Sequence, residues 1–129
     1  MRISDDQPNS ERILLVEDEP IVRDFLAALL RRHGYEVVDS ATPEDALEWL
    51  QAGRPVDLLI TDIVMPGMNG WDLAKLAKQQ RPTLRLLYMS GYADQFAVAA
   101  TRLQPGATFL QKPFTITEMT DKVKSVLAC

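Results

Sequence analysis

The chain alternates between two kinds of hydrophobic pattern. Short apolar runs cover residues 12–16, 36–38, 57–61, 84–89 and 107–110. Stretches with apolar positions at helical spacing lie at 20–32, 43–52, 71–80, 93–103 and 115–127. Apolar runs without polar alternation are typical of parallel strands covered on both faces, and 3.6-residue spacing is typical of amphipathic helices. Five successive strand–helix units predict an α/β fold with a parallel sheet and helices on both faces.

Local signals mark where the predicted helices begin and end. Pro20 suits a first helical position, and Gly34 is a typical residue just after a helix. Thr42 before Pro43 predicts a capped helix start. Gly67 and Gly70 are interpreted as turn residues only.

Composition adds limits to this picture. A length of 129 residues with 47% apolar and 25% charged residues predicts one globular domain at 11–129. The polar residues 1–10 are predicted to be a disordered tail. A net charge of −4 with scattered basic residues argues against direct nucleic-acid binding. No membrane-spanning stretch or signal-peptide core is found, so a cytoplasmic location and no membrane association are expected.

Two isolated reactive residues receive ordinary interpretations. The only cysteine, Cys129, is the last residue, which excludes an internal disulfide. The only histidine, His33, precedes Gly34 and is interpreted as a helix-end residue, where a helix C-terminus favours positive charge.

Polar side chains follow four of the apolar runs. They are Glu17 and Asp18, Asp62, Ser90, and Lys112. Because parallel strands end at the same edge of a sheet, these groups are predicted to meet there. Clustered carboxylates repel one another and imply a cation, and oxygen ligands favour Mg²⁺. A carboxylate beside Mg²⁺, a hydroxyl and an ammonium suggests phosphoryl chemistry.

Four sequence blocks carry a family resemblance. Residues 16–19, 61–70, 89–92 and 111–114 resemble the signature blocks of response-regulator receiver domains, in order and with suitable spacing over 11–127. The resemblance implies a flavodoxin-like five-stranded sheet of order 2-1-3-4-5. It also implies a two-component phosphorelay, with a sensor histidine kinase or histidine phosphotransfer protein as partner. The string at 89–94 resembles receivers attached to hybrid histidine kinases.

The resemblance assigns roles to the acidic residues. Asp62 matches the phosphoacceptor, which would take a phosphoryl group from a phosphohistidine. Asp18 matches a direct Mg²⁺ ligand, and Glu17 its companion, acting directly or through water. The remaining protein ligand would be the backbone carbonyl of Val64. Only self-catalysed phosphorylation and dephosphorylation of Asp62 are implied, without turnover of a metabolite.

The resemblance also assigns a switch. Lys112 would pair with Asp62 at rest and with a phosphoryl oxygen afterwards, and the family has a cis peptide before the residue matching Pro113. Ser90 would donate its hydroxyl to the phosphoryl group. Phe109 would then turn inward, although a core role for this aromatic residue stays open. The face formed by the last strand and the last two helices would bind an output partner.

Two hypotheses concern the surroundings of the site. Val64 and Tyr92 flank it and could hinder attacking water, which would make the phosphorylated state long-lived. The apolar positions of the helix at 20–32 span about half of its circumference, wider than a core stripe requires. Ile21 or Phe25 is therefore expected to remain exposed as a docking patch for a kinase helix. A broad core face is the alternative.

Rival functions remain open. An Asp-nucleophile phosphatase would need a second aspartate two residues after Asp62, where the chain has Val64. A flavin or nucleotide binder would place phosphate beside Glu17, Asp18 and Glu19, which repel it. A module that binds partners without phosphorylation is the principal alternative.

Overall fold

The computed structural model describes residues 11–91 and 108–128, so the expected tail at 1–10, the expected helix at 93–103 and Tyr92 lie outside the described residues. The strands are β2 (Arg12–Val16), β3 (Glu36–Ser40), β4 (Leu58–Asp62), β5 (Arg85–Ser90) and β6 (Phe109–Gln111). The helices are α1 (Pro20–Arg32), α2 (Pro43–Gln51), α3 (Gly70–Gln80) and α5 (Ile116–Ala128). Every one of these elements was predicted from the hydrophobic pattern, and each end lies within two residues of its predicted position.

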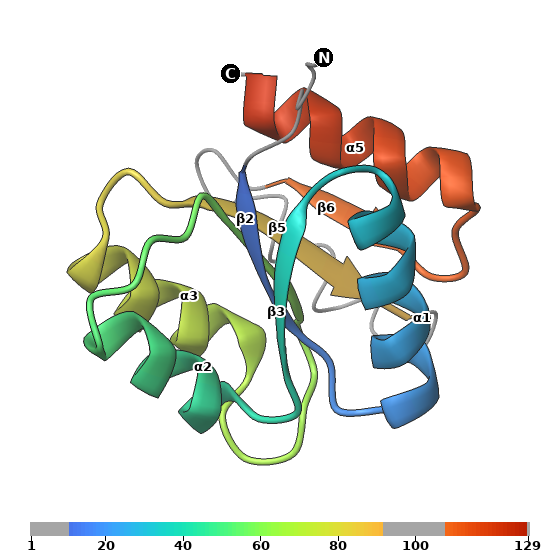
Figure 1. Cartoon of the computed structure of the whole chain (residues 1–129). Coiled ribbons are helices and arrows are strands. Elements are labelled where there is room, and N and C mark those ends of the chain that lie inside the picture. Colours follow the sequence, from blue (N-terminus) through green and yellow to red (C-terminus); the bar gives the residue numbers. More distant parts are fainter. Residues whose placement is uncertain (1–10, 92–107, 129) are drawn as a thin grey trace.

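The strands form one parallel sheet in the order β3-β2-β4-β5-β6. Counted along the chain, this is the predicted order 2-1-3-4-5. The helices α1 and α5 cover one face of the sheet, and α2 and α3 cover the other (Figure 1). No described helix combines the length and the apolar character needed to cross a membrane.

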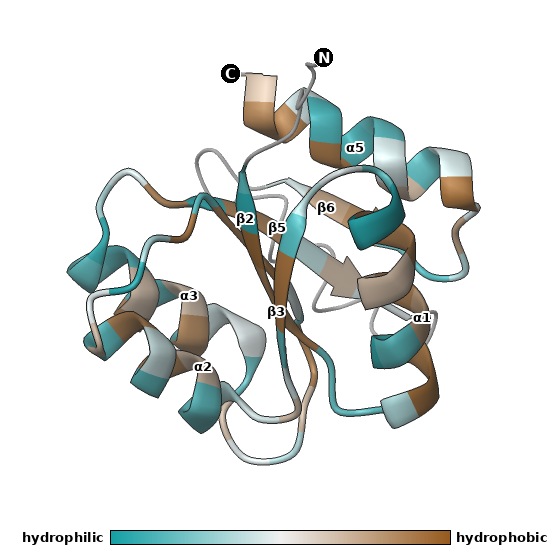
Figure 2. Cartoon of the chain, viewed as in Figure 1, coloured by the Kyte–Doolittle hydropathy of each residue, from teal (hydrophilic) through white to brown (hydrophobic). Residues whose placement is uncertain are grey.

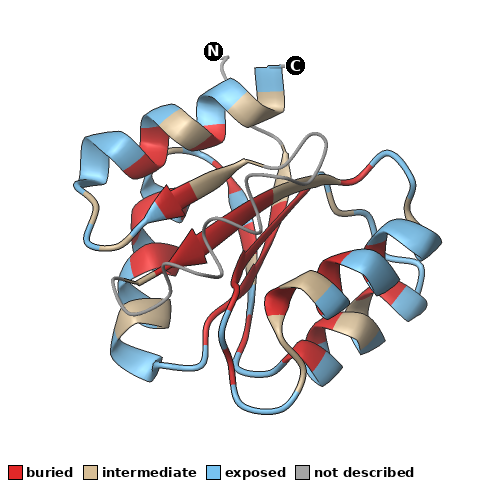
Figure 3. Ribbon diagram, turned by 180° about the vertical axis from the view of Figure 1, so that it is seen from behind, coloured by how far each residue is buried: buried red, intermediate tan, exposed pale blue. Residues whose placement is uncertain are grey.

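Burial on both sides explains the unbroken apolar runs of the strands. Along β2, Ile13 and Leu15 pack in the layer with α1 and α5, whereas Leu14 and Val16 pack with α2 and α3. All five residues of β4 are buried. Figure 2 shows the strands coloured mainly as hydrophobic, and Figure 3 shows them buried while the outer sides of the helices are exposed. The sheet is therefore the central layer of a three-layer core.

Several predicted element ends are confirmed. Thr42 caps α2, where its Oγ1 accepts a hydrogen bond from the Asp45 amide at 3.1 Å. His33 is the C-terminal cap of α1, and Gly34 follows with a φ of 94° that favours glycine. The helix α5 begins after Thr115, which accepts a hydrogen bond from the Glu118 amide at 3.0 Å.

Two details differ from the sequence interpretation. The strands β4 and β5 each run one residue further than predicted, so Asp62 and Ser90 are the last residues of their strands. Gly70 is more than a turn residue. It is the first residue of α3, and a Cβ there would lie 2.1 Å from the carbonyl oxygen of Asp62. Only glycine allows the start of α3 to approach the end of β4 this closely.

Candidate functional site

The register of the sheet brings the predicted polar residues together. It pairs Val16 with Thr61, Asp62 with Met89, and Ser90 with Gln111. The residues that follow β2 and β6 therefore lie beside the ends of β4 and β5. The Lys112 amide also donates to the carbonyl of Ser90 at 2.6 Å, which fixes the lysine next to this edge.

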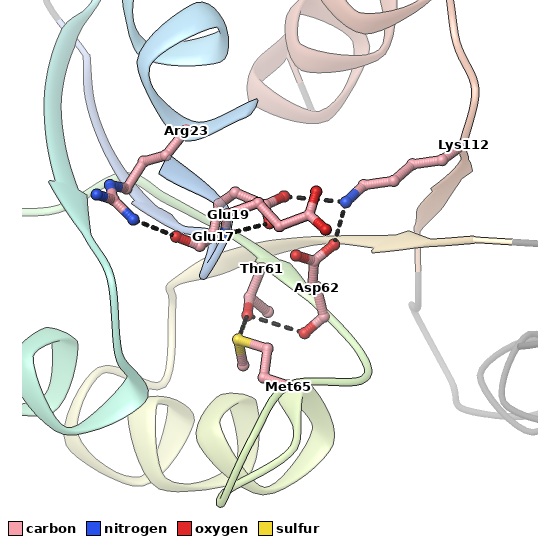
Figure 4. A network of polar contacts seen from close by, with 7 residues as sticks. All are labelled: Glu17, Glu19, Arg23, Thr61, Asp62, Met65 and Lys112. Carbon is pink, nitrogen blue, oxygen red and sulfur yellow. Dashed lines mark hydrogen bonds and ion pairs between the residues drawn. The ribbon is translucent and has the colours of Figure 1, made fainter. Parts of the chain in front are cut away.

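Lys112 contacts two carboxylates at once. Its Nζ lies 2.8 Å from Oδ1 of Asp62 and 2.9 Å from Oε1 of Glu17 (Figure 4). The pairing of Lys112 with Asp62 is the arrangement that the family resemblance implied. The contact with Glu17 was not foreseen. Lys112 is joined to the next residue, Pro113, by a cis peptide bond.

Glu17 is buried and held through both its side chain and its backbone. Its Oε2 accepts a hydrogen bond from the Glu19 amide at 3.1 Å, while Oε1 contacts Lys112. Its own amide donates to the carbonyl of Ser40 at 3.1 Å. Its carbonyl accepts from Nη1 of Arg23 at 2.9 Å. Both oxygens of the carboxylate therefore already have protein donors.

The three charged groups shift one another's pKa values. Burial, followed by the neighbouring Glu17 carboxylate, raises the pKa of Asp62 to about 8, although Lys112 opposes this change. Burial also disfavours the charged form of Glu17, but hydrogen bonding to Asp62, Lys112 and the Glu19 amide outweighs burial and lowers the pKa of Glu17. Burial disfavours the charged form of Lys112, but the two carboxylates raise the pKa of Lys112. Asp62 is thus the group with the least favourable charge.

The remaining candidate residues surround this cluster. Ser90 is buried, and its Oγ has no hydrogen-bond partner within the part of the chain that the structure describes. Phe109 is half-buried, pairs in register with Tyr88 and packs against the core cluster that contains Tyr88. Val64 is 57% exposed, and Asp18 is exposed. Tyr92 lies outside the described residues.

A sequence model of the response regulator receiver domain matches residues 13–124. The chain belongs to this family. Receiver domains of two-component systems are generally non-enzymatic phosphoacceptors.

Known receiver proteins resemble the chain to different extents. It is 35% identical over 117 residues to the response regulator receiver protein CpdR of Brucella abortus, which covers 91% of the chain and 97% of that protein. It is 33% identical over 123 residues to the sensor kinase CckA of the same organism, which covers 95% of the chain but 13% of the kinase. A solved response regulator receiver protein from Sinorhizobium medicae has a TM-score of 0.84 and 29% identity, covering 93% of the chain and 96% of that structure.

The acidic residues of this receiver domain fit a magnesium ion by their chemistry. Oxygen atoms of Glu17, Asp18 and Asp62 all lie within 4.8 Å of one another. Oxygen donors at one exposed and two buried positions suit a hard divalent cation that keeps part of its water shell. The raised pKa of Asp62 shows that uncompensated negative charge is costly here. Glu17, with both oxygens already engaged, is the acid least free to act as a direct ligand.

Three features of the receiver site were missed from the sequence. They are the Glu17–Lys112 contact, the close approach of Gly70 to Asp62, and the hydrogen bond from Arg23 to the Glu17 carbonyl. The only available signal was for Arg23, a basic residue one turn into a helix that follows the acidic pair. No local sequence pattern indicates the other two features, because each is a contact between segments that are separate in the sequence.

Proposed function

We propose that Asp62 accepts a phosphoryl group from a phosphohistidine of a partner protein, at a site that holds Mg²⁺, and that Ser90 and Phe109 transmit the change. The observation that carries the proposal is the contact of Lys112 Nζ with Asp62 Oδ1 at 2.8 Å beside the acidic oxygens. An ammonium and a metal-binding group beside one carboxylate suit attack on an anionic phosphoryl group.

The chemistry requires the charged form of Asp62. One of its oxygens attacks phosphorus, the bond between phosphorus and the histidine nitrogen breaks, and the imidazole takes up a proton as it leaves. Asp18 and Asp62, with Glu17 and the backbone carbonyl of Val64, would hold the ion. Bound there, Mg²⁺ supplies positive charge that offsets the repulsion between the carboxylate and the phosphoryl oxygens. Lys112 adds a second positive charge next to the same carboxylate.

The proposed switch combines a buried hydroxyl group, that of Ser90, with a half-buried aromatic side chain, that of Phe109. The Ser90 Oγ is a buried donor whose hydrogen-bonding capacity is unused among described residues, and a phosphoryl oxygen on Asp62 would satisfy it. Phe109 is half-buried beside Tyr88, so a change of side-chain position would alter the surface next to β6. This surface is the proposed output face.

The partner follows from the phosphoryl donor. A sensor histidine kinase or a histidine phosphotransfer protein would present its phosphohistidine to Asp62. Ile21 and Phe25 of α1 are 84% and 54% exposed, which fits the expected apolar docking patch beside the acidic site.

The test is phosphorylation by acetyl phosphate. The wild-type chain with Mg²⁺ should gain the mass of one phosphoryl group, and chelation of the metal should prevent the gain. Asp62→Asn should not be modified, whereas Asp57→Asn, just before the opposite end of β4, should be modified normally. No mass gain in the wild type would favour a module that binds partners without phosphorylation, and a gain in Asp62→Asn would move the acceptor elsewhere.

A further inference from the structure

Arg23 joins α1 to the backbone that carries the acidic pair. Its Nη1 donates to the carbonyl of Glu17 at 2.9 Å, and its Nε lies 3.7 Å from Oδ2 of Asp39 in β3 (Figure 4 shows the contact with Glu17). The Arg23 side chain is only 17% exposed. Charge-assisted hydrogen bonds of this kind are stronger than neutral ones. The Arg23 guanidinium therefore restrains the backbone of the segment 17–19, called the acidic loop below, which connects β2 to α1.

The contact fixes the peptide that leads into Asp18. The Glu17 carbonyl belongs to the same planar unit as the Asp18 amide, so a hydrogen bond to its oxygen sets the orientation of that unit. On the other side of Glu17, the amide is held by the Ser40 carbonyl at 3.1 Å. The backbone is thus fixed on both sides of Glu17. This restrains the position of the Asp18 backbone, from which the Asp18 side chain extends.

Charge and geometry make opposite predictions for Arg23. A guanidinium close to an acidic cluster repels a divalent cation, so by charge alone its removal would tighten metal binding. By geometry, its removal releases the peptide before Asp18 and weakens the ligand set. Loss of groups that orient metal ligands commonly costs about tenfold or more in affinity.

We propose that Arg23 is a positioning residue of the acidic site, which raises its Mg²⁺ affinity by holding the Glu17–Asp18 peptide in place. The inference rests on the proposed function, because that function requires Mg²⁺ at these acids. It concerns affinity for the ion and assigns Arg23 no contact with the ion or with the phosphoryl group.

Arg31 provides a matched control on the same helix. It pairs with the same Asp39, at 3.3 Å, but its hydrogen bond to a backbone carbonyl goes to Val37, at 2.8 Å, and not to Glu17. Arg23→Gln and Arg31→Gln remove the same charge and one ion pair with the same carboxylate. Only the first removes the hydrogen bond to the acidic loop.

The experiment is calorimetric titration of Mg²⁺ into the full chain. Arg23→Gln is expected to bind about tenfold more weakly than the wild type. Arg31→Gln is expected to bind within about twofold of the wild type, because its contacts lie on β3. Arg23→Lys, which keeps a positive donor, should recover part of the affinity, and it replaces Arg23→Gln if that variant does not fold.

Amide hydrogen exchange in the presence of a chelator gives a readout without metal. The Glu19 amide is bonded to the Glu17 carboxylate and should exchange faster in Arg23→Gln but not in Arg31→Gln. Equal or tighter Mg²⁺ binding by Arg23→Gln, or equal weakening in both variants, would overturn the proposal. Absence of Mg²⁺ binding by the wild type would instead overturn the proposed function on which the inference rests.

Discussion

The Lys112 ammonium lies 2.9 Å from the buried carboxylate of Glu17 as well as 2.8 Å from Asp62. One positive charge is therefore shared between two acids, and neither acid is fully neutralised by it. The charged form of Glu17 is stabilised further, because the Glu19 amide also donates a hydrogen bond to its carboxylate. The charged form of Asp62 is disfavoured instead: burial and the neighbouring Glu17 raise the pKa of Asp62 to about 8.

Removing the charge of Glu17 should make Asp62 more acidic. In Glu17→Gln, the pKa of Asp62 is expected to fall below its value of about 8, because the like charge is gone. Burial remains and should keep it above the ordinary value of 3.8. A carboxyl-carbon NMR titration in chelator measures this. Glu19→Gln, an exposed substitution of the same type two residues away, should leave the Asp62 titration unchanged, and a rise in Glu17→Gln would contradict the assignment.

The raised pKa of Asp62 should also make metal-free stability depend on pH. Between 3.8 and about 8 the folded chain holds a proton on Asp62 that the unfolded chain has released. Stability contributed by this proton is therefore lost as the pH rises through that window. Between about pH 5 and about pH 8, the free energy of unfolding should fall less in Asp62→Asn than in the wild type. The difference should be at least about 1 kcal/mol.

Denaturant unfolding in chelator at several pH values measures this slope. Asp121→Asn, on α5 outside the acidic cluster, is the control and should retain the wild-type slope. The lowered pKa of Glu17 acts in the opposite direction, but its contribution is lost only as the pH falls below the ordinary value of 4.5. Identical slopes in wild type and Asp62→Asn would show that Asp62 does not hold the proton.

The sequence predicted the elements of this site better than its contacts. The strands followed from apolar runs because the sheet is covered on both faces, and Asp62, Ser90 and Lys112 followed from their places at strand ends. The contact between Glu17 and Lys112 joins residues 95 positions apart and depends on side-chain reach, which periodicity does not encode. Gly70 was misinterpreted for the same reason, because its requirement comes from the backbone of another segment.

That requirement of Gly70 can be separated from ordinary glycine flexibility. Gly70→Ala would place a Cβ 2.1 Å from the Asp62 carbonyl oxygen, so backbone must move. We expect a loss of about 3 kcal/mol in unfolding free energy and slower phosphorylation. Gly67→Ala has open space around its Cβ but a φ of 80°, and should cost only about 1 kcal/mol. Urea unfolding of both variants measures the difference, and equal losses would contradict the close-approach argument.

Ile21 tests the docking patch on α1. It is 84% exposed, and Ile21→Asp should slow phosphotransfer from a histidine kinase about tenfold while leaving acetyl phosphate labelling of Asp62 intact. Leu76→Asp, at another exposed apolar position on α3, should affect neither assay. Equal loss in both assays for Ile21→Asp would indicate damage to the site itself and refute docking.

Val64→Ala tests whether the Val64 side chain slows hydrolysis of the phosphoryl group on Asp62. Val64 lies two residues after Asp62 and is 57% exposed. Under the shielding hypothesis, its side chain hinders water that approaches a phosphoryl group on Asp62. Val64→Ala should increase the rate of hydrolysis about threefold, or about 0.6 kcal/mol in activation free energy, because a smaller side chain excludes less water. A decay time course of the purified phosphoprotein measures this rate. Leu76→Ala, an exposed apolar position on α3, should decay like the wild type. An unchanged rate in Val64→Ala would leave the lifetime to other groups around Asp62 and end the shielding hypothesis.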